Sequence, residues 1–164
     1  MRTWDQVIRD GLQMYTHRDE YAYFFGAKGE KLTYAIMTSL WNVYYDQYFK
    51  KYNEKQRCDI FAYSVGKTGY DCSGFITRLT GCACDSASLI GKCTQVTKDI
   101  SSGVAGSLLW LPGHIGLDIG YGAYLHMPSE LHTITLGRFQ DKSVNWTKTG
   151  KLTPYVNYEG SDAR

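Results

Sequence analysis

The chain has 164 residues, which is enough for one well-buried domain and too few for two of ordinary size. Its 43% hydrophobic and 21% charged residues are typical of a globular protein rather than a disordered one. The 18 Lys and Arg residues against 16 Asp and Glu give a net charge of only +2, which argues against nucleic acid or an anionic membrane as the main partner.

The N-terminal segment is expected to form a helix. Thr3 and Gln6 make a candidate capping box. Apolar residues then recur at helical spacing: Trp4, Val7, Ile8, Leu12 and Tyr15. Charges every few positions leave no apolar core for a signal peptide, so we expect a protein made in the cytoplasm without one.

The next part of the chain is predicted to contain one helix between two irregular segments. The stretch YAYFFGAKGEKLT, residues 21–33, combines aromatic residues with two glycines, which predicts a loop. A helix is expected from Thr33 to about Lys51. Its apolar face would comprise Ile36, Leu40, Val43 and Tyr44. Residues 53–69 are polar and contain glycine, so they are expected to be mostly loop.

The second half begins with a helix and continues as strands. Phe75, Ile76 and Leu79 predict a helix that starts near Cys72. Alternation with period two then predicts four short strands: SLLWL, HIGLDIG, AYLHM and LHTITL, at 107–111, 114–120, 123–127 and 131–136. Helices followed by strands predict an α+β fold with an antiparallel sheet, in a single domain over residues 1–164.

One cysteine lies at a position in the sequence that favours a role as a nucleophile. Cys72 lies in the string GYDCSGF, at the first turn of its predicted helix. The free amides and partial positive charge of a helix N-terminus favour a thiolate and can stabilise an oxyanion. The competing interpretation is a small buried residue at the start of a helix.

Two histidines on neighbouring predicted strands could serve that thiol. If the apolar residues of both strands face the core, His114 and His126 share the other face and lie nearly opposite each other, with Gly116 leaving space beside His114. One imidazole can act as base while the other orients it. The alternative is a pair of solvated surface histidines.

The other cysteines do not predict a disulfide framework or a metal site. Five cysteines are an odd number in a chain without a signal peptide. Cys82, Cys84 and Cys93 suggest zinc, but their spacing is unlike that of common zinc sites, and free thiols are the preferred interpretation. We expect no metal and no cofactor.

Three motifs in this order resemble the NlpC/P60 family of papain-like cysteine peptidases: DCSGF at 71–75, LLWLPGHIGLDIG at 108–120 and AYLHMP at 123–128. The resemblance covers roughly residues 60–130 and implies a papain-like fold with N-terminal helices packed on a central antiparallel sheet. It implies that Cys72 is the nucleophile, His114 the base and His126 the third polar residue.

Further residues enter the site through the same resemblance. YFFGAKG at 23–29 resembles the family's aromatic-x-x-Gly segment, which implies that Tyr23 lines the site. Asp71 and Ser73 would help to anchor the free amine of the substrate, although helix capping explains Asp71 equally well. A helical insertion at about residues 32–57 departs from the family pattern.

The implied reaction is hydrolysis of the peptide stems of bacterial peptidoglycan, at the bond between D-γ-glutamate and a diamino acid. That activity suits a phage endolysin or a similar wall-lytic enzyme, which would act on the cell wall after release or export. The alternatives are an N-acetylmuramoyl-L-alanine amidase on the same scaffold and a non-catalytic module that binds peptides. We expect a monomer with no nucleic-acid or membrane partner.

Overall fold

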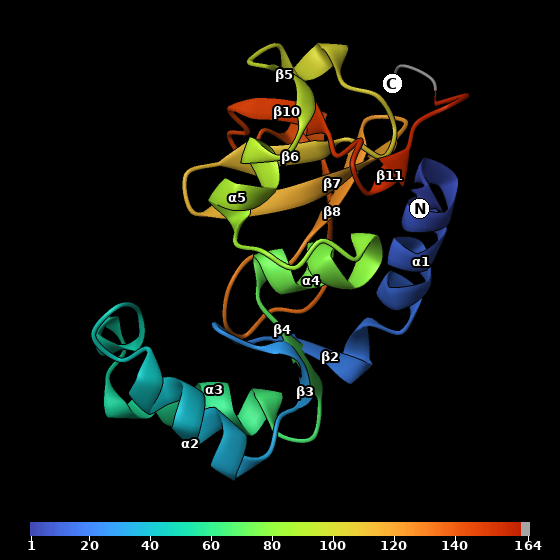
Figure 1. The fold of residues 1–164 in the computed structure, drawn as a ribbon. Helices are drawn as coiled ribbons and strands as arrows, with labels where there is room; N and C mark the ends of the chain where they lie inside the picture. The colour runs from blue at the N-terminus through green and yellow to red at the C-terminus, as the bar shows by residue number, and fades with distance from the viewer. Residues whose placement is uncertain (162–164) are drawn as a thin grey trace.

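The structure is a computed structural model, and it describes residues 1–161 (Figure 1). The α-helices are α1 (Trp4–Thr16), α2 (Tyr34–Val43), α3 (Glu54–Ser64), α4 (Cys72–Thr80) and α5 (Ser86–Gly91). The strands are β1 (Arg2–Thr3), β2 (Tyr21–Tyr23), β3 (Lys28–Lys31), β4 (Thr68–Tyr70), β5 (Thr94–Thr97), β6 (Leu108–Leu111), β7 (His114–Gly120), β8 (Ala123–His126), β9 (Thr135–Arg138), β10 (Lys148–Lys151) and β11 (Val156–Asn157).

The largest sheet of the described residues has six strands in the order β5-β10-β6-β7-β8-β9. Every neighbouring pair in it is antiparallel. Helix α4 packs beside β7, and α1 packs against α4 (Figure 1). The fold is therefore α+β, with helices packed on an antiparallel sheet, as predicted.

The main core lies between this sheet and the two helices. Its fully buried side chains include Val7, Phe75, Ile76, Leu79, Leu108, Ile115, Leu117 and Leu125. Burial of each such side chain contributes roughly 1.5–3 kcal/mol relative to an exposed one. This core thus holds α4, the helix that begins at Cys72, against the β7–β8 hairpin that carries both histidines. Helix α1 and strand β6 contribute to the same core.

The predicted N-terminal helix is confirmed as α1. Thr3 accepts a hydrogen bond from the Gln6 backbone, and the Gln6 side chain accepts one from the Thr3 backbone. The predicted apolar face is partly wrong, because Leu12 is 39% exposed and Met14 is buried instead. Gly11 provides the close approach, since a Cβ there would lie 3.2 Å from the Leu125 side chain.

The strand predictions are confirmed for β6, β7 and β8. A tight turn between β7 and β8 contains Gly120 and Gly122, both with positive φ. The fourth strand was misplaced. The chain turns at Glu130 and Leu131, so β9 begins only at Thr135. Strand β10 was not predicted, because its sequence KTGK carries no apolar alternation.

Three short strands, β2, β3 and β4, lie in segments that were predicted to be mostly loop. Strand β2 pairs with β4 in parallel and β3 pairs with β4 antiparallel, giving a small separate sheet. These strands have three or four residues, which is too short for alternation to show. Gly69 is required on β4, since a Cβ there would lie 2.7 Å from the Leu32 side chain.

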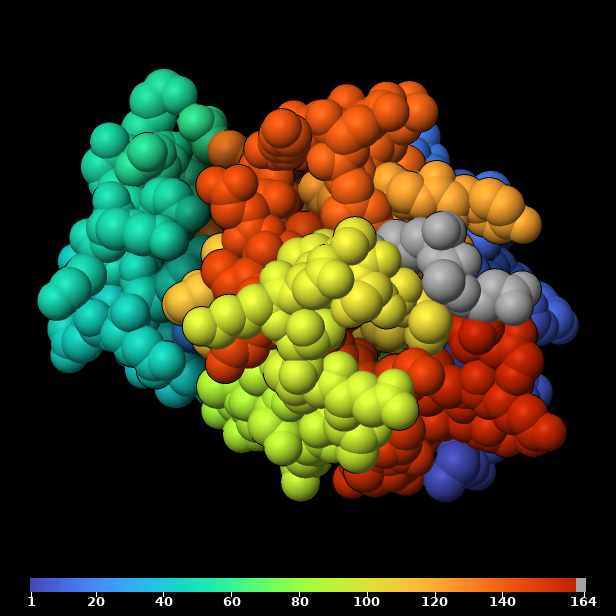
Figure 2. Space-filling view, turned by 90° about the horizontal axis from the view of Figure 1, so that it is seen from above, coloured from blue at the N-terminus to red at the C-terminus, as the bar shows by residue number. Residues whose placement is uncertain are grey.

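Residues 34–64, called the helical arm below, also differ from prediction. Helix α2 ends at Val43 rather than near Lys51, and its buried residues are Met37 and Trp41 rather than the predicted face. Where a loop was expected, Asn53 caps α3. The arm has its own core cluster, which includes Phe24, Met37, Trp41, Phe49, Ile60 and Phe61. It forms one end of the molecule (Figure 2).

The two ends of the described chain lie together, because β1 pairs in parallel with β11. None of the helices in residues 1–161 is long and apolar enough to cross a membrane. In Figure 1 the six-stranded sheet lies above α4, the joined ends lie beside the sheet next to α1, and the helical arm lies beyond the small sheet.

Candidate active site

Cys72 is the first residue of α4, as predicted, and only 8% of it is exposed. Asp71 caps the helix by accepting a hydrogen bond from the Gly74 backbone at 2.7 Å. The Cys72 sulfur lies 3.9 Å from the Gly113 carbonyl oxygen and also faces the Ile115 backbone N–H. The thiol therefore lies against the backbone on both sides of His114.

His114 and His126 contact each other directly. His114 Nε2 lies 2.8 Å from His126 Nδ1, and the ring planes are inclined at 67°. The strand register differs in detail from the expected one, because His126 is paired with Gly116 and lies diagonal to His114. The rings still meet, since diagonal neighbours on a sheet are within reach of long side chains.

Trp146, which the sequence analysis did not select, completes the surroundings of both histidines. Its indole stacks on His114, with ring centroids 5.3 Å apart and planes at 14°, and meets His126 edge-on at 5.9 Å. Gly116 makes room for it, because a Cβ there would lie 2.8 Å from the indole. The space expected beside His114 is thus filled by Trp146, from the segment before β10.

Burial sets the protonation of these groups. It raises the pKa of the Cys72 thiol to about 11, with the Asp71 carboxylate adding to the effect. Burial lowers the pKa of His114 to about 4, and burial together with His114 lowers that of His126 to about 3. A neutral thiol and neutral imidazoles are therefore favoured at rest, in place of the thiolate expected from the helix N-terminus.

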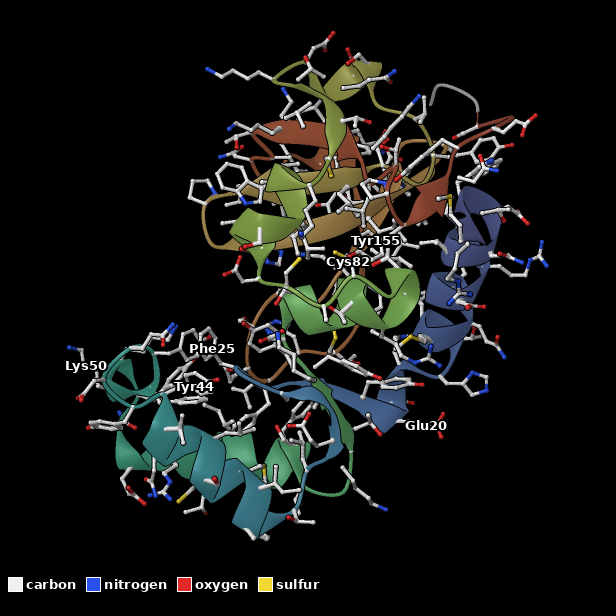
Figure 3. The ribbon with its side chains drawn as sticks, in the orientation of Figure 1. Glu20, Phe25, Tyr44, Lys50, Cys82 and Tyr155 are labelled. Atoms are coloured by element: carbon white, nitrogen blue, oxygen red, sulfur yellow. The ribbon has the colours of Figure 1, made fainter. Side chains whose placement is uncertain are left out.

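A pocket of about 710 Å³ opens beside Cys72. One wall is aromatic and comes from two segments: Tyr23 and Phe25 at the end of β2, and Tyr44 and Tyr48 from the helical arm. Phe25 meets Tyr44 edge-on with centroids 5.3 Å apart (Figure 3). The insertion predicted at about residues 32–57 thus supplies part of the pocket wall.

Tyr23 lines this pocket but only 5% of it is exposed. Burial raises the pKa of its hydroxyl, and the nearby carboxylate of Glu130 acts in the same direction. The Tyr48 side chain lies beside it in the pocket wall. Tyr23 therefore joins the pocket wall to the helical arm, next to the thiol.

Asp71 and Ser73 also line the pocket, and both contact Lys28. Lys28 Nζ lies 2.7 and 3.0 Å from the two Asp71 carboxylate oxygens and 2.9 Å from Ser73 Oγ. Asp71 thus caps the helix and pairs with a cation of its own chain. No pattern in the sequence indicated that Lys28 would reach Asp71.

Glu130 is a third residue that the sequence did not indicate. It is 4% exposed and accepts hydrogen bonds from Tyr48 at 2.5 Å, Tyr52 at 2.7 Å and the Phe25 backbone at 3.1 Å. These contacts tie the turn before β9 to the helical arm and to the aromatic wall of the pocket.

The remaining cysteines lie on other segments, and Cys84 also lines the pocket beside Cys72. Cys82 and Cys84 have their sulfur atoms 3.4 Å apart, Cys93 donates to the Leu89 carbonyl, and Cys58 is exposed. All of them are free thiols. Within residues 1–161 there is no group of three or more His, Cys, Asp or Glu arranged to hold a metal ion.

Two solved structures have a similar fold. NlpC2 from Trichomonas vaginalis matches with a TM-score of 0.54 and 11% identity, over 90% of this chain and 46% of that one. NlpC1 from the same organism matches with a TM-score of 0.51 and 11% identity, over 88% and 44%. The chain spans less than half the length of these structures. No family model matches it, and no curated protein does.

The likeness establishes the fold as that of NlpC/P60 structures.

Proposed function

We propose that this chain is a cysteine peptidase that hydrolyses the peptide stems of bacterial peptidoglycan at the D-γ-glutamyl–diamino acid bond. The observation that carries the proposal is the contact between His114 and His126 at 2.8 Å, with the Cys72 thiol against the backbone that flanks His114. A thiol, a base and a group that orients the base are the parts that nucleophilic catalysis needs.

The contact between the histidines is compatible with the tautomers that this chemistry requires. If Nε2 of His114 donates to Nδ1 of His126, Nδ1 of His114 is left unprotonated and can accept the thiol proton. His126 then holds the ring in place and stabilises the imidazolium that forms. The neutral state that burial favours for His114 keeps it available as a base.

The reaction proceeds through a thioester. Cys72 Sγ bonds to the carbonyl carbon of the substrate as its proton passes to His114, and the oxyanion is stabilised by the backbone N–H of Cys72 at the start of α4. The C–N bond then breaks, and His114 returns the proton to the leaving amine. Water, deprotonated by His114, hydrolyses the thioester and restores the thiol.

The proposed setting is that of a phage endolysin or a similar wall-lytic enzyme, made in the cytoplasm and acting on the cell wall after release or export. Its partner would be the peptide stem alone. The aromatic wall formed by Tyr23, Phe25, Tyr44 and Tyr48 offers apolar surface for the stem beside the thiol.

Incubation with purified peptidoglycan, followed by mass spectrometry of the released fragments, tests this function, with Cys72→Ala as the matched control. A new free amine on the diamino acid, produced by the wild type alone, is expected. Intact stems with a free N-terminal alanine would identify an amidase instead. Tight binding to peptidoglycan without any released fragment would identify a non-catalytic module.

A further inference from the structure

A lysine contacts the residues on both sides of the proposed nucleophile. Lys28 is the first residue of β3, and half of its side chain is exposed. Its ammonium donates to both carboxylate oxygens of Asp71, at 2.7 and 3.0 Å, and to Ser73 Oγ at 2.9 Å. Because Cys72 lies between these two residues, the cation is held beside the first turn of α4.

The segment that carries Lys28 is packed tightly against this turn. The Gly26 backbone donates to Asp71 Oδ2 at 3.2 Å, and the Asp71 backbone donates to the Ala27 carbonyl oxygen at 3.0 Å. A Cβ at Gly74 would lie 2.8 Å from that carbonyl oxygen and 3.2 Å from the Lys28 side chain. Gly74 thus lets the start of β3 approach α4 closely enough for the ammonium to reach the carboxylate.

The ion pair matters to the thiol because a buried carboxylate opposes negative charge on a neighbouring sulfur. Only 7% of Asp71 and 8% of Cys72 are exposed, so water screens the interaction between them weakly. Burial is the main cause of the raised pKa of the Cys72 thiol; the Asp71 carboxylate adds to it, and the charge of Lys28 lowers it. The cation thus opposes the effect of the carboxylate that it binds.

The other groups around the sulfur do not supply a positive side chain. The Gly113 carbonyl oxygen and the Ile115 backbone N–H face it, and Tyr23 lines the same pocket. Asp85, the second acid of the pocket lining, is the cap of α5. Within residues 1–161, Lys28 is the cationic side chain of this lining.

We infer that Lys28 is a positioning residue for the nucleophile and acts through Asp71. Its ammonium offsets the charge of the carboxylate, so that the neighbouring sulfur can acquire negative charge as its proton passes to His114. The inference rests on the proposed function for the identity of the nucleophile and adds a residue to it. Because it concerns the thiol itself, it can be tested without any substrate.

Alkylation of Cys72 by iodoacetamide, an uncharged reagent, measures how readily the thiolate forms, and mass spectrometry of the peptide that contains Cys72 separates it from the other thiols. Lys28→Met removes the cation and keeps most of the side-chain volume, so it should slow alkylation at pH 8 by about threefold or more. Lys28→Arg keeps the charge and should stay within about twofold of the wild type. Lys31→Met, on the same strand but exposed and outside the pocket lining, is the matched control and should also stay within that range.

Asp71→Asn separates an effect of charge from an effect of structure. Asparagine caps helices as well as aspartate does, so the variant can keep the hydrogen bond to the Gly74 backbone while it loses the negative charge. We expect alkylation about threefold or more faster than in the wild type. The double variant Lys28→Met/Asp71→Asn should return to the wild-type rate or exceed it. A lysine that only held β3 against α4 would give neither the acceleration nor the rescue.

Urea unfolding of each variant shows that the rates are compared between folded proteins. Alkylation of Lys28→Met as fast as that of the wild type, or slower alkylation of folded Asp71→Asn, would overturn the inference, whatever fragments the wild type releases from peptidoglycan. The expected order of alkylation rates, together with no release of fragments by the wild type, would contradict the peptidase function and retain the effect of Lys28 on the thiol. If Lys28→Met does not fold, because the buried carboxylate is left unpaired, Lys28→Gln and the comparison of Asp71→Asn with the wild type decide the question.

Discussion

The indole of Trp146 lies nearly parallel to the imidazole of His114, with centroids 5.3 Å apart and planes at 14°. Together with His126 it encloses the ring that is proposed to take the thiol proton. The stack excludes water from one face of His114 and limits rotation of the ring. Trp146 thus contributes to the burial that keeps His114 neutral.

Replacement of Trp146 by alanine should lower kcat/KM by roughly tenfold or more, because a base that rotates freely is less often aligned with the thiol. Trp146→Phe should retain most of the activity, since it keeps an aromatic face and removes only a buried indole N–H that has no hydrogen-bond partner in the described residues. Steady-state rates on purified peptidoglycan measure both effects, and urea unfolding separates them from instability.

Gly116→Ala provides the complementary change. The added Cβ would lie 2.8 Å from the indole, so Trp146 must shift although its own side chain is intact. Activity below that of Trp146→Phe is expected. Full activity of Gly116→Ala would show that the position of the indole does not matter to the reaction.

The two histidines should respond differently to substitution. His114→Ala removes the base and should reduce the rate by several orders of magnitude, as Cys72→Ala should. His126→Gln should lose much less, because the amide oxygen can still accept the hydrogen bond from His114 Nε2. Equal losses for His126→Gln and His114→Ala, measured as peptidoglycan release, would contradict the orienting role given to His126.

Local signals explain which parts of the fold could be predicted. The capping box of Thr3 and Gln6, the helix that starts at Cys72 and the turn at Gly120 and Gly122 are all specified within a few residues. The alternation of apolar residues in β7 and β8 also makes the hairpin predictable, and with it the position of the two histidines.

The rest of the site depends on contacts that no local pattern reveals. Lys28 meets Asp71 across 43 residues, and Glu130 meets Tyr48 across 82. Helix α3 was missed although Asn53 and its partner three residues later form a capping box, because its buried residues are few and follow no clear stripe. Its place is decided by the aromatic core of the helical arm.

Glu130 gives a prediction about stability. Glu130→Ala would leave the hydroxyls of Tyr48 and Tyr52 and the Phe25 backbone N–H without their acceptor. A fully buried unpaired donor costs about 1–3 kcal/mol, but these three residues are half-buried and water can reach part of them. We therefore expect the free energy of unfolding to fall by about 2–4 kcal/mol. Glu130→Gln keeps one acceptor oxygen and should lose less.

Urea unfolding measures this change, with Glu20→Ala as the matched control, because Glu20 is exposed (Figure 3). A stability of Glu130→Ala within 0.5 kcal/mol of the wild type, the range of ordinary surface substitutions, would mean that these donors find water or other partners.

The buried histidines predict how stability depends on pH. Burial lowers the pKa of His114 to about 4 and of His126 to about 3, against an ordinary value of 6.5 in the unfolded chain. Below pH 6.5 the unfolded chain therefore binds more protons than the folded chain does. The contribution of these two groups to the free energy of unfolding is at its full value above that pH. It is lost as the pH falls from 6.5 toward 4, by an amount on the order of 3 kcal/mol for His114.

Thermal unfolding between pH 7.5 and 4.5 measures this loss against two variants. His126→Gln removes one of the buried groups, so its unfolding temperature should fall less steeply with acid than that of the wild type. His17→Gln, at an exposed histidine, should follow the wild type and controls for acidic groups common to all three proteins. Because the neutral form of His114 is the base, peptidoglycan release should also persist below pH 6 and decline toward pH 4. The prediction would be contradicted by two results together: the same fall of unfolding temperature with pH for the wild type and His126→Gln, and activity already halved near pH 6.5. Both imidazoles would then titrate as exposed groups, contrary to the burial that Trp146 helps to provide.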